Sequence, residues 1–312
     1  MKAKTIVMLM VKVIILIIVM FILFSVGTSL GGFQSDTSQM TREESGMAAL
    51  ALLVVCLIDV LILIHLILRS RIAGVRLMLM VAIVFYGVKT FMSQIEAWYF
   101  MPNISPEMLP KLFLMTVPIA VFFPPLAVFI LGKHREDTQH QETSNVRLVM
   151  PVREWAWKLA VLAGIIYPLL FFGFGYFVAW QNPELRAFYG GTDLDNVFAH
   201  YINAFSADPK LYTFEVFRGL LWIGLAIPVI RTLKGHPWEA GLLVALLFSL
   251  LMNDVLILPN PLMPPSVRFS HFIETASSNF IWAWIIVGLL LWRPKHTAED
   301  KRGKGDVQAE MA

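Results

Sequence analysis

Residues 5–30 read TIVMLMVKVIILIIVMFILFSVGTSL, an apolar stretch in which Lys12 is the one charged residue. A bilayer core about 30 Å thick is crossed by a helix of about 20 apolar residues, so this stretch is long enough to span a membrane. The basic start MKAK and the small residues at the end also fit a cleaved signal peptide. The length of the stretch and its internal Lys12 favour a retained anchor.

Seven further apolar runs of similar length follow, and they predict an all-α polytopic membrane protein. The fourth run contains Pro118, Pro124 and Pro125, which predict a kinked helix. We expect one transmembrane domain over residues 1–294 and a solvated polar cytoplasmic tail over residues 295–312. The predicted spans are residues 5–30, 47–68, 75–100, 111–131, 155–180, 212–230, 239–258 and 268–292.

The composition excludes several classes of protein. Hydrophobic residues make up 57% of the chain and charged residues 15%, with a mean hydropathy of +0.69. A soluble domain has about 45 to 50% apolar and about 25% charged residues. Soluble enzymes and disordered chains are therefore excluded. The single cysteine, Cys56, excludes an intrachain disulfide and a cysteine-based metal cluster.

Lysine and arginine are distributed unevenly between the predicted loops. Lys12, Lys89 and Arg218 fall inside spans, and of the other 22 residues 17 lie in the set of loops and ends that contains both termini. The positive-inside rule then predicts that both termini are cytoplasmic, and we expect the plasma (inner) membrane. The basic residues sit at helix ends, so no nucleic-acid partner is expected. The five on the opposite side are Arg42, Lys111, Arg186, Lys210 and Arg268.

The loop between the fifth and sixth spans carries an amphipathic pattern. Apolar residues from Leu194 to Phe205 recur at helical spacing, and Thr192 with Asp195 has the spacing of a capping box. The pattern predicts an extracytoplasmic interfacial helix over about residues 192–206, which ends before Asp208. Such a helix packs at the membrane surface or covers the bundle as a lid.

Polar residues concentrate near the predicted outer ends of four spans. A charge at the bilayer centre costs about 2.5 to 3.5 kcal/mol, so these side chains should face inward and meet. In the third span, Tyr86, Lys89, Ser93 and Glu96 have the spacing of one helix face, and His271 and Glu274 share a face in the eighth. The predicted cluster of ligand-binding residues comprises Glu96, Lys89, Arg218, Asp254, Arg268, His271 and Glu274.

A separate pair of charges lies nearer the predicted cytoplasmic side. Lys12 in the first span and Asp59 in the second lie at similar depth. The simplest interpretation is a buried ion pair that joins the two helices, and a proton relay through Asp59 and His65 is the alternative.

Three functions remain open on the sequence alone. The first is a polar cavity open to the extracytoplasmic side that binds or transports a small polar solute or a lipid head group. The second is an intramembrane enzyme that acts on a lipid-linked substrate by carboxylate and histidine acid–base or metal chemistry. The third is a structural or accessory subunit. The chain contains no HExxH or GxSxG motif and no phosphate loop, so no metal site is predicted, and the sequence does not identify a cofactor.

Overall fold

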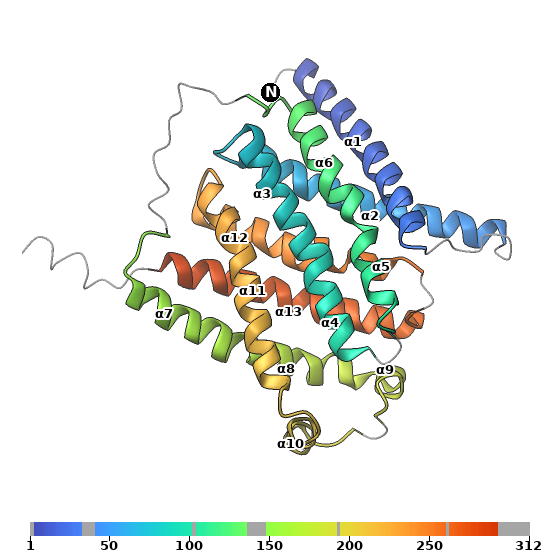
Figure 1. The fold of residues 1–312 in the computed structure, drawn as a ribbon, viewed down its shortest axis with the longest axis vertical. Coiled ribbons are helices and arrows are strands. Elements are labelled where there is room, and N and C mark those ends of the chain that lie inside the picture. Colours follow the sequence, from blue (N-terminus) through green and yellow to red (C-terminus); the bar gives the residue numbers. More distant parts are fainter. Residues whose placement is uncertain are drawn as a thin grey trace, which may run out of the picture.

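The computed structural model describes residues 3–32, 41–101, 104–135, 148–191, 194–259 and 262–292 of the chain (Figure 1). Eight helices of the described residues are long and apolar enough to cross a membrane, one for each predicted span. The predicted all-α polytopic membrane protein is therefore confirmed. The predicted tail over residues 295–312 lies outside the described residues.

Several spans consist of more than one helical segment. The third, fifth and seventh are each interrupted by a π-helical turn, named η2, η4 and η6. The segments are α1 (Ala3–Leu30), α2 (Arg42–Arg69), α3 (Gly74–Tyr86), η2 (Gly87–Met92), α4 (Ser93–Phe100), α5 (Met108–Met115), α6 (Val117–Ile130), α7 (Val152–Val161), η4 (Leu162–Ile166), α8 (Tyr167–Phe177), η5 (Ala179–Gln181), α9 (Pro183–Phe188), α10 (Val197–Ala207), α11 (Leu211–Thr232), α12 (Pro237–Leu246), η6 (Leu247–Leu251), η7 (Asp254–Ile257) and α13 (Pro265–Leu291).

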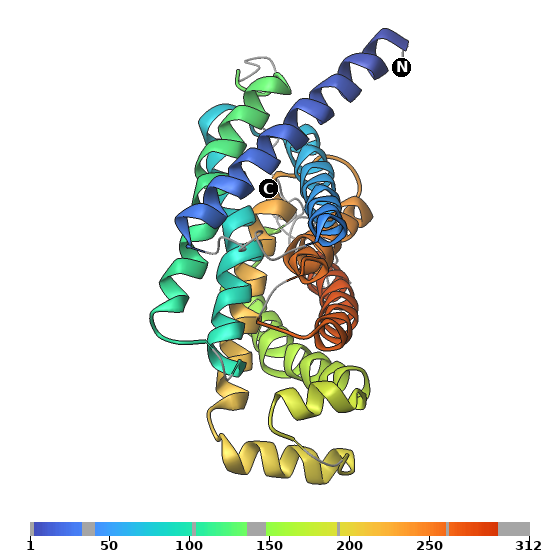
Figure 2. The same cartoon turned by 90° about the vertical axis from the view of Figure 1, so that its right-hand side faces the viewer.

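The spans form two layers that cross at a steep angle. One layer contains α3 with α4, α5 with α6, and α11, which run along the long axis of the molecule (Figure 1). The second contains α2, α12 and α13, which run across the first layer and are seen nearly end-on after a quarter turn (Figure 2). The apolar core between the layers includes Phe85, Trp222, Phe248 and Trp282, whose side chains are fully buried.

Helix α1 lies at the periphery and packs on α2, α5 and α6. Only 11% of its most apolar window is buried, as expected of a helix that faces lipid on most sides. Its close approach to α5 depends on Gly27, because a Cβ atom at this position would lie 1.8 Å from the backbone oxygen of Met115. The contact therefore requires the absence of a side chain.

A backbone junction ties the end of α2 to the turn between α11 and α12. Ser70 and Leu233 form an isolated antiparallel bridge. The Arg71 amide donates to the Thr232 carbonyl and the Lys234 amide to the Arg69 carbonyl, both at 2.7 Å. The end of α2 and the turn that follows α11 are thus fixed to each other at this end of the molecule.

The short amphipathic helix is present as α10, at the opposite end of the molecule from this junction (Figures 1 and 2). It begins at Val197, later than predicted, because the side chain of Asn196 accepts a hydrogen bond from the Ala199 amide and acts as the cap. The proposed capping residue Thr192 lies outside the described residues. The predicted end before Asp208 is confirmed.

Candidate functional site

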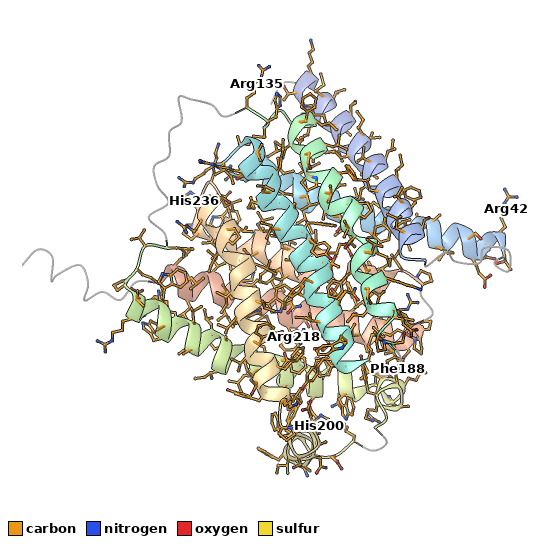
Figure 3. The ribbon with its side chains drawn as sticks, viewed as in Figure 1. Arg42, Arg135, Phe188, His200, Arg218 and His236 are labelled. Atoms are coloured by element: carbon orange, nitrogen blue, oxygen red, sulfur yellow. The ribbon has the colours of Figure 1, made fainter. Side chains whose placement is uncertain are left out.

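Arg218 is the centre of the first buried polar cluster. It lies on α11 one turn after Glu215, and its Nη1 atom donates hydrogen bonds to both carboxylate oxygens of Glu215 at 3.0 Å. Its Nη2 atom donates to Glu96 on α4. All three side chains are buried, so this ion pair joins the third span to the sixth. In Figure 3, Arg218 lies nearer to His200 than to His236 at the other end.

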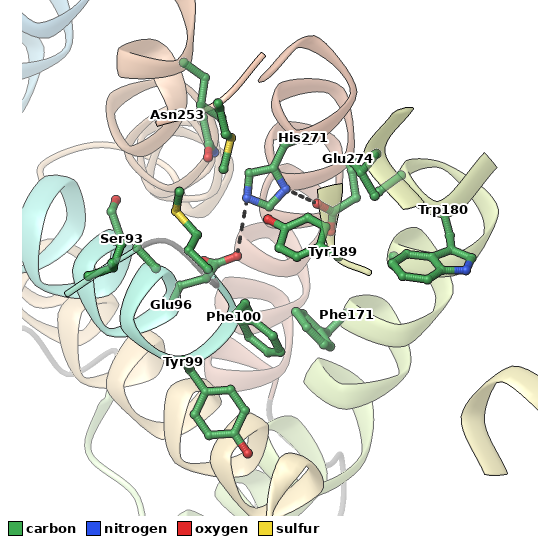
Figure 4. Close-up of a pocket in the computed structure, with 18 of the residues that line it drawn as sticks. Ser93, Glu96, Tyr99, Phe100, Phe171, Trp180, Tyr189, Asn253, His271 and Glu274 are labelled. Carbon is green, nitrogen blue, oxygen red and sulfur yellow. Dashed lines mark ion pairs between the residues drawn. The ribbon is translucent and has the colours of Figure 1, made fainter. Parts of the chain in front are cut away.

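His271 on α13 connects this cluster to the eighth span. Its Nδ1 atom lies 3.1 Å from a carboxylate oxygen of Glu274, one turn further along the helix. Its Nε2 atom lies 3.8 Å from a carboxylate oxygen of Glu96. The imidazole therefore stands between two carboxylates from different spans, as Figure 4 shows.

The Glu96, His271 and Glu274 side chains line one end of a pocket of about 520 Å³. Ligand pockets for small molecules typically have volumes of about 300 to 1,000 Å³, so the size fits an organic ligand. The remaining wall is largely apolar, and several of its side chains are aromatic (Figure 4). The aromatic side chains that surround the polar end are Tyr99, Phe100, Phe171, Trp180 and Tyr189.

Helix α10 covers the end of the pocket farthest from the junction. The His200 ring packs against the rings of Trp180 and Tyr201 with centroid distances of 4.9 Å, and the Tyr201 hydroxyl donates to the Phe172 carbonyl. Burial lowers the pKa of His200, so this imidazole is neutral at neutral pH. Phe198 and Ile202 remain exposed on the other face of α10, which fits contact with lipid at the interface.

Two of the proposed ligand-binding residues belong to a second cluster. The Lys89 ammonium contacts Asp59 on α2 at 2.7 Å and Asp254 at the start of η7 at 2.6 Å, and all three side chains are fully buried. Lys89 and Asp254 do not line the pocket. The predicted single polar face from Lys89 to Glu96 is therefore wrong.

The expected pair between Lys12 and Asp59 is also wrong. Asp59 contacts Lys89 from the third span, while Lys12 on the peripheral α1 is half-buried. The depths of Lys12 and Asp59 were similar and α1 does pack on α2, but similar depth does not specify which faces of the two helices meet.

The Arg268 side chain is hydrogen-bonded to the chain that precedes its own helix. Its Nη1 atom donates to the carbonyl oxygens of Leu256 and Leu258. The guanidinium thus holds the chain between η7 and α13, and it does not line the pocket. Of the seven proposed residues, the structure brings four into one cluster beside the pocket: Glu96, Arg218, His271 and Glu274.

The charges beside the pocket do not balance. When ionised, Glu96, Glu215 and Glu274 contribute three negative charges, against one positive charge from Arg218. A protonated His271 adds a second positive charge and still leaves the cluster negative. Buried charges need partners or are neutralised, so this end of the pocket takes up either protons or a cationic group.

The aromatic wall was not identified from the sequence. Tyr99, Trp180 and Tyr189 lie near the ends of predicted spans, where aromatic residues also gather at ordinary membrane interfaces. One signal was present, because Trp180 and Tyr189 flank the loop that leads to the amphipathic helix. That position alone does not distinguish a pocket wall from an interfacial belt.

Within the described residues, no three side chains of histidine, cysteine, aspartate or glutamate are grouped so that they could hold a metal ion. Comparison of the chain with protein-family models, curated proteins and solved structures finds no match. The geometry and charge of the pocket are therefore the basis for inferring a function.

Proposed function

We propose that this integral membrane protein binds an organic cation, a small solute or lipid head group that carries an ammonium group, in the pocket beneath α10. One observation carries the proposal: a pocket of about 520 Å³, with aromatic side chains in its wall, ends at the carboxylates of Glu96 and Glu274, which together with Glu215 outnumber the neighbouring cations when all three are ionised. Aromatic faces attract cations by about 0.5 to 2 kcal/mol each. Carboxylates and aromatic rings together therefore select for positive charge.

An anionic ligand fits this pocket less well. Arg218 already donates to Glu96 and Glu215, and Arg268 donates to backbone carbonyls. A phosphate or carboxylate in the pocket would face Glu96 and Glu274 without a free arginine to bind it. Repulsion from these two carboxylates then opposes binding.

Binding of tetramethylammonium and choline to the purified protein in detergent tests the proposal. Wild-type protein should bind both probes saturably, and Glu274→Gln should weaken binding by at least about tenfold because it removes a buried charge partner. Glu184→Gln is the matched control, since Glu184 is exposed on α9 and its loss should leave affinity unchanged. Isothermal calorimetry measures each affinity.

The two sources of the ammonium group are distinguished by the lipids that co-purify with the protein. Phosphatidylcholine or phosphatidylethanolamine retained by wild type and lost in Glu274→Gln would identify a head group. Binding of free choline without a retained lipid would identify a solute. The proposal is rejected if neither probe binds and no ammonium lipid is retained, or if Glu274→Gln binds as wild type does.

A second candidate function is acid–base catalysis on a lipid-linked substrate. It is supported by the contacts of His271, whose Nδ1 atom is oriented by Glu274 while the ring lines the pocket. A histidine oriented in this way is suited to proton transfer. Turnover of a bound lipid that His271→Ala abolishes would favour the enzyme. Retention of an unchanged ligand would favour binding or transport, and absence of both would favour an accessory subunit.

We further propose that both termini are cytoplasmic and that α10 lies on the extracytoplasmic side of the plasma membrane. The bias of 17 against 5 basic residues supports this orientation. In a Cys56→Ser background, a cysteine at Asp195, beside α10, should react with an impermeant thiol reagent in intact cells. A cysteine at Lys234, in the turn at the junction, should react only after permeabilisation. The reverse labelling would place the pocket on the cytoplasmic side.

A further inference from the structure

The second cluster has a charge that its own residues do not neutralise. Asp59 and Asp254 contribute two negative charges when ionised and Lys89 one positive charge, and the exposed fraction of all three side chains is 0%. An uncompensated charge in a low-dielectric interior is very costly. The cluster therefore needs one further positive charge to be electrically neutral.

Each carboxyl group of the cluster has an oxygen atom that is buried without a hydrogen-bond partner, Oδ2 of Asp59 and Oδ2 of Asp254. The Oδ1 atom of Asp254 accepts from Lys89 at 2.6 Å, whereas its Oδ2 atom is buried without a hydrogen-bond partner. The carboxyl groups of Asp59 and Asp254 lie close to each other, because both contact the single Lys89 ammonium, at 2.7 and 2.6 Å. Two ionised carboxylates are both acceptors, so a hydrogen bond between them requires a proton on one of them.

The backbone around the cluster is built from widened turns. Lys89 lies within the π-helical turn η2, and η6 ends three residues before Asp254. The carbonyl of Leu251, the last residue of η6, accepts a hydrogen bond from the Lys89 ammonium at 3.4 Å. Single π-helical turns inside α-helices are rare and occur frequently at functional sites.

None of the described neighbouring residues supplies the further positive charge that Asp59, Lys89 and Asp254 need. Cys56 is the titratable neighbour on α2, one turn before Asp59. From η6 and the following residues, Ser249 and Asn253 are neutral and donate to backbone carbonyls, and Thr275 of α13 donates to Asn253. The next charged group along the third span is Glu96, which is paired with Arg218.

We infer that Asp59, Lys89 and Asp254 together form a proton-binding site that holds one exchangeable proton, shared between the two carboxyl groups. A hard metal cation takes about six oxygen ligands, far more than the two unpartnered Oδ2 atoms of Asp59 and Asp254 offer. A proton needs one donor position and one acceptor, which the two carboxyl groups supply. Asn253 and Val255 line the pocket, so the site lies directly behind the pocket wall.

Infrared spectroscopy of the full-length protein in nanodiscs tests this site. Aspartate labelled with ¹³C separates aspartic acid bands from those of the buried glutamates, and Asp59 and Asp254 are the buried aspartates among the described residues. Wild type at neutral pH should show the C=O band of a protonated carboxylic acid that shifts with the label and again in D₂O. Absence of such a label-sensitive band would show that both aspartates are ionised and would overturn the inference.

Substitutions assign the band. Asp254→Asn and Asp59→Asn should each abolish the band. In either variant one carboxylate remains beside Lys89, and this ion pair has no net charge without an added proton. Asp195→Asn, which removes an exposed aspartate, should leave the band unchanged. Persistence of the band in both cluster variants, or its insensitivity to D₂O, would place the proton elsewhere or make it non-exchangeable, and either result overturns the inference. If neither variant folds, the labelled wild-type spectrum decides alone.

Discussion

Replacement of Lys89 by methionine should sharply lower the stability and yield of the protein. The change leaves the buried carboxyl groups of Asp59 and Asp254 without the ammonium that both contact. Removal of one partner from a buried ion pair typically costs about 3 to 5 kcal/mol, and a typical folded domain is stable by only about 5 to 15 kcal/mol. Thermal unfolding in detergent measures the loss.

Neutral partners should restore most of this stability. A triple variant with Lys89→Met, Asp59→Asn and Asp254→Asn carries no buried charge at this position, and such replacements are often nearly neutral. Lys12→Met is the control for the loss of a lysine within a span, since Lys12 is half-buried on the peripheral helix α1. If the triple variant is as unstable as Lys89→Met, electrostatics is not the cause of the loss.

Replacement of Arg218 by methionine should have a comparable effect. Arg218 joins Glu215 to Glu96 and is 2% exposed, so its loss strands two buried carboxylates at a cost of about 3 to 5 kcal/mol. Its guanidinium also lies 5.5 to 5.9 Å from the ring centroids of Tyr167, Phe171 and Phe214. These contacts disappear with it, and the melting temperature should fall accordingly.

Two comparisons isolate the cause. Addition of Glu96→Gln and Glu215→Gln to Arg218→Met should recover a large part of the melting temperature. Lys210→Met removes a basic residue from the exposed start of α11 and should change it little. Equal losses for Arg218→Met and Lys210→Met would mean that the buried ion pair contributes nothing measurable to stability.

The spans and the depth of the polar residues follow from local properties of the sequence. Runs of about 20 apolar residues between polar loops specify a transmembrane helix without reference to other parts of the chain. Glu96, Arg218 and Glu274 each lie near the same end of a span, and the cost of their charge in lipid requires them to face inward. Their convergence beside the pocket was predictable for this reason.

The partners within the cluster were not predictable, because helix geometry changes inside the spans. Glu96 follows Lys89 by seven positions, which places both on one face of a regular α-helix. The turn η2 (Gly87–Met92) is wider than an α-helical turn and changes that relation. Lys89 therefore contacts Asp59 and Asp254, whereas Glu96 contacts Arg218.

Which helix faces meet was equally impossible to derive from the local sequence. Lys12 and Asp59 are matched in depth, but the third span supplies the partner of Asp59. The aromatic residues of the pocket wall could not be identified from the sequence for a related reason. Phe100 and Phe171 would be equally acceptable in contact with lipid. Only the packing of α4 against α8 turns these rings toward a common space, where their centroids lie 5.6 Å apart.

The junction at Ser70 and Leu233 restricts how the sixth span can move. Sliding of α11 along α2 by one turn, about 5.4 Å, would break both backbone hydrogen bonds of the junction. A tilt of α11 about the junction preserves them, and its amplitude grows along the helix toward Leu211, which lines the pocket. If α11 tilts about this bridge, the displacement is therefore largest at the end of the helix that carries Leu211, beside the pocket.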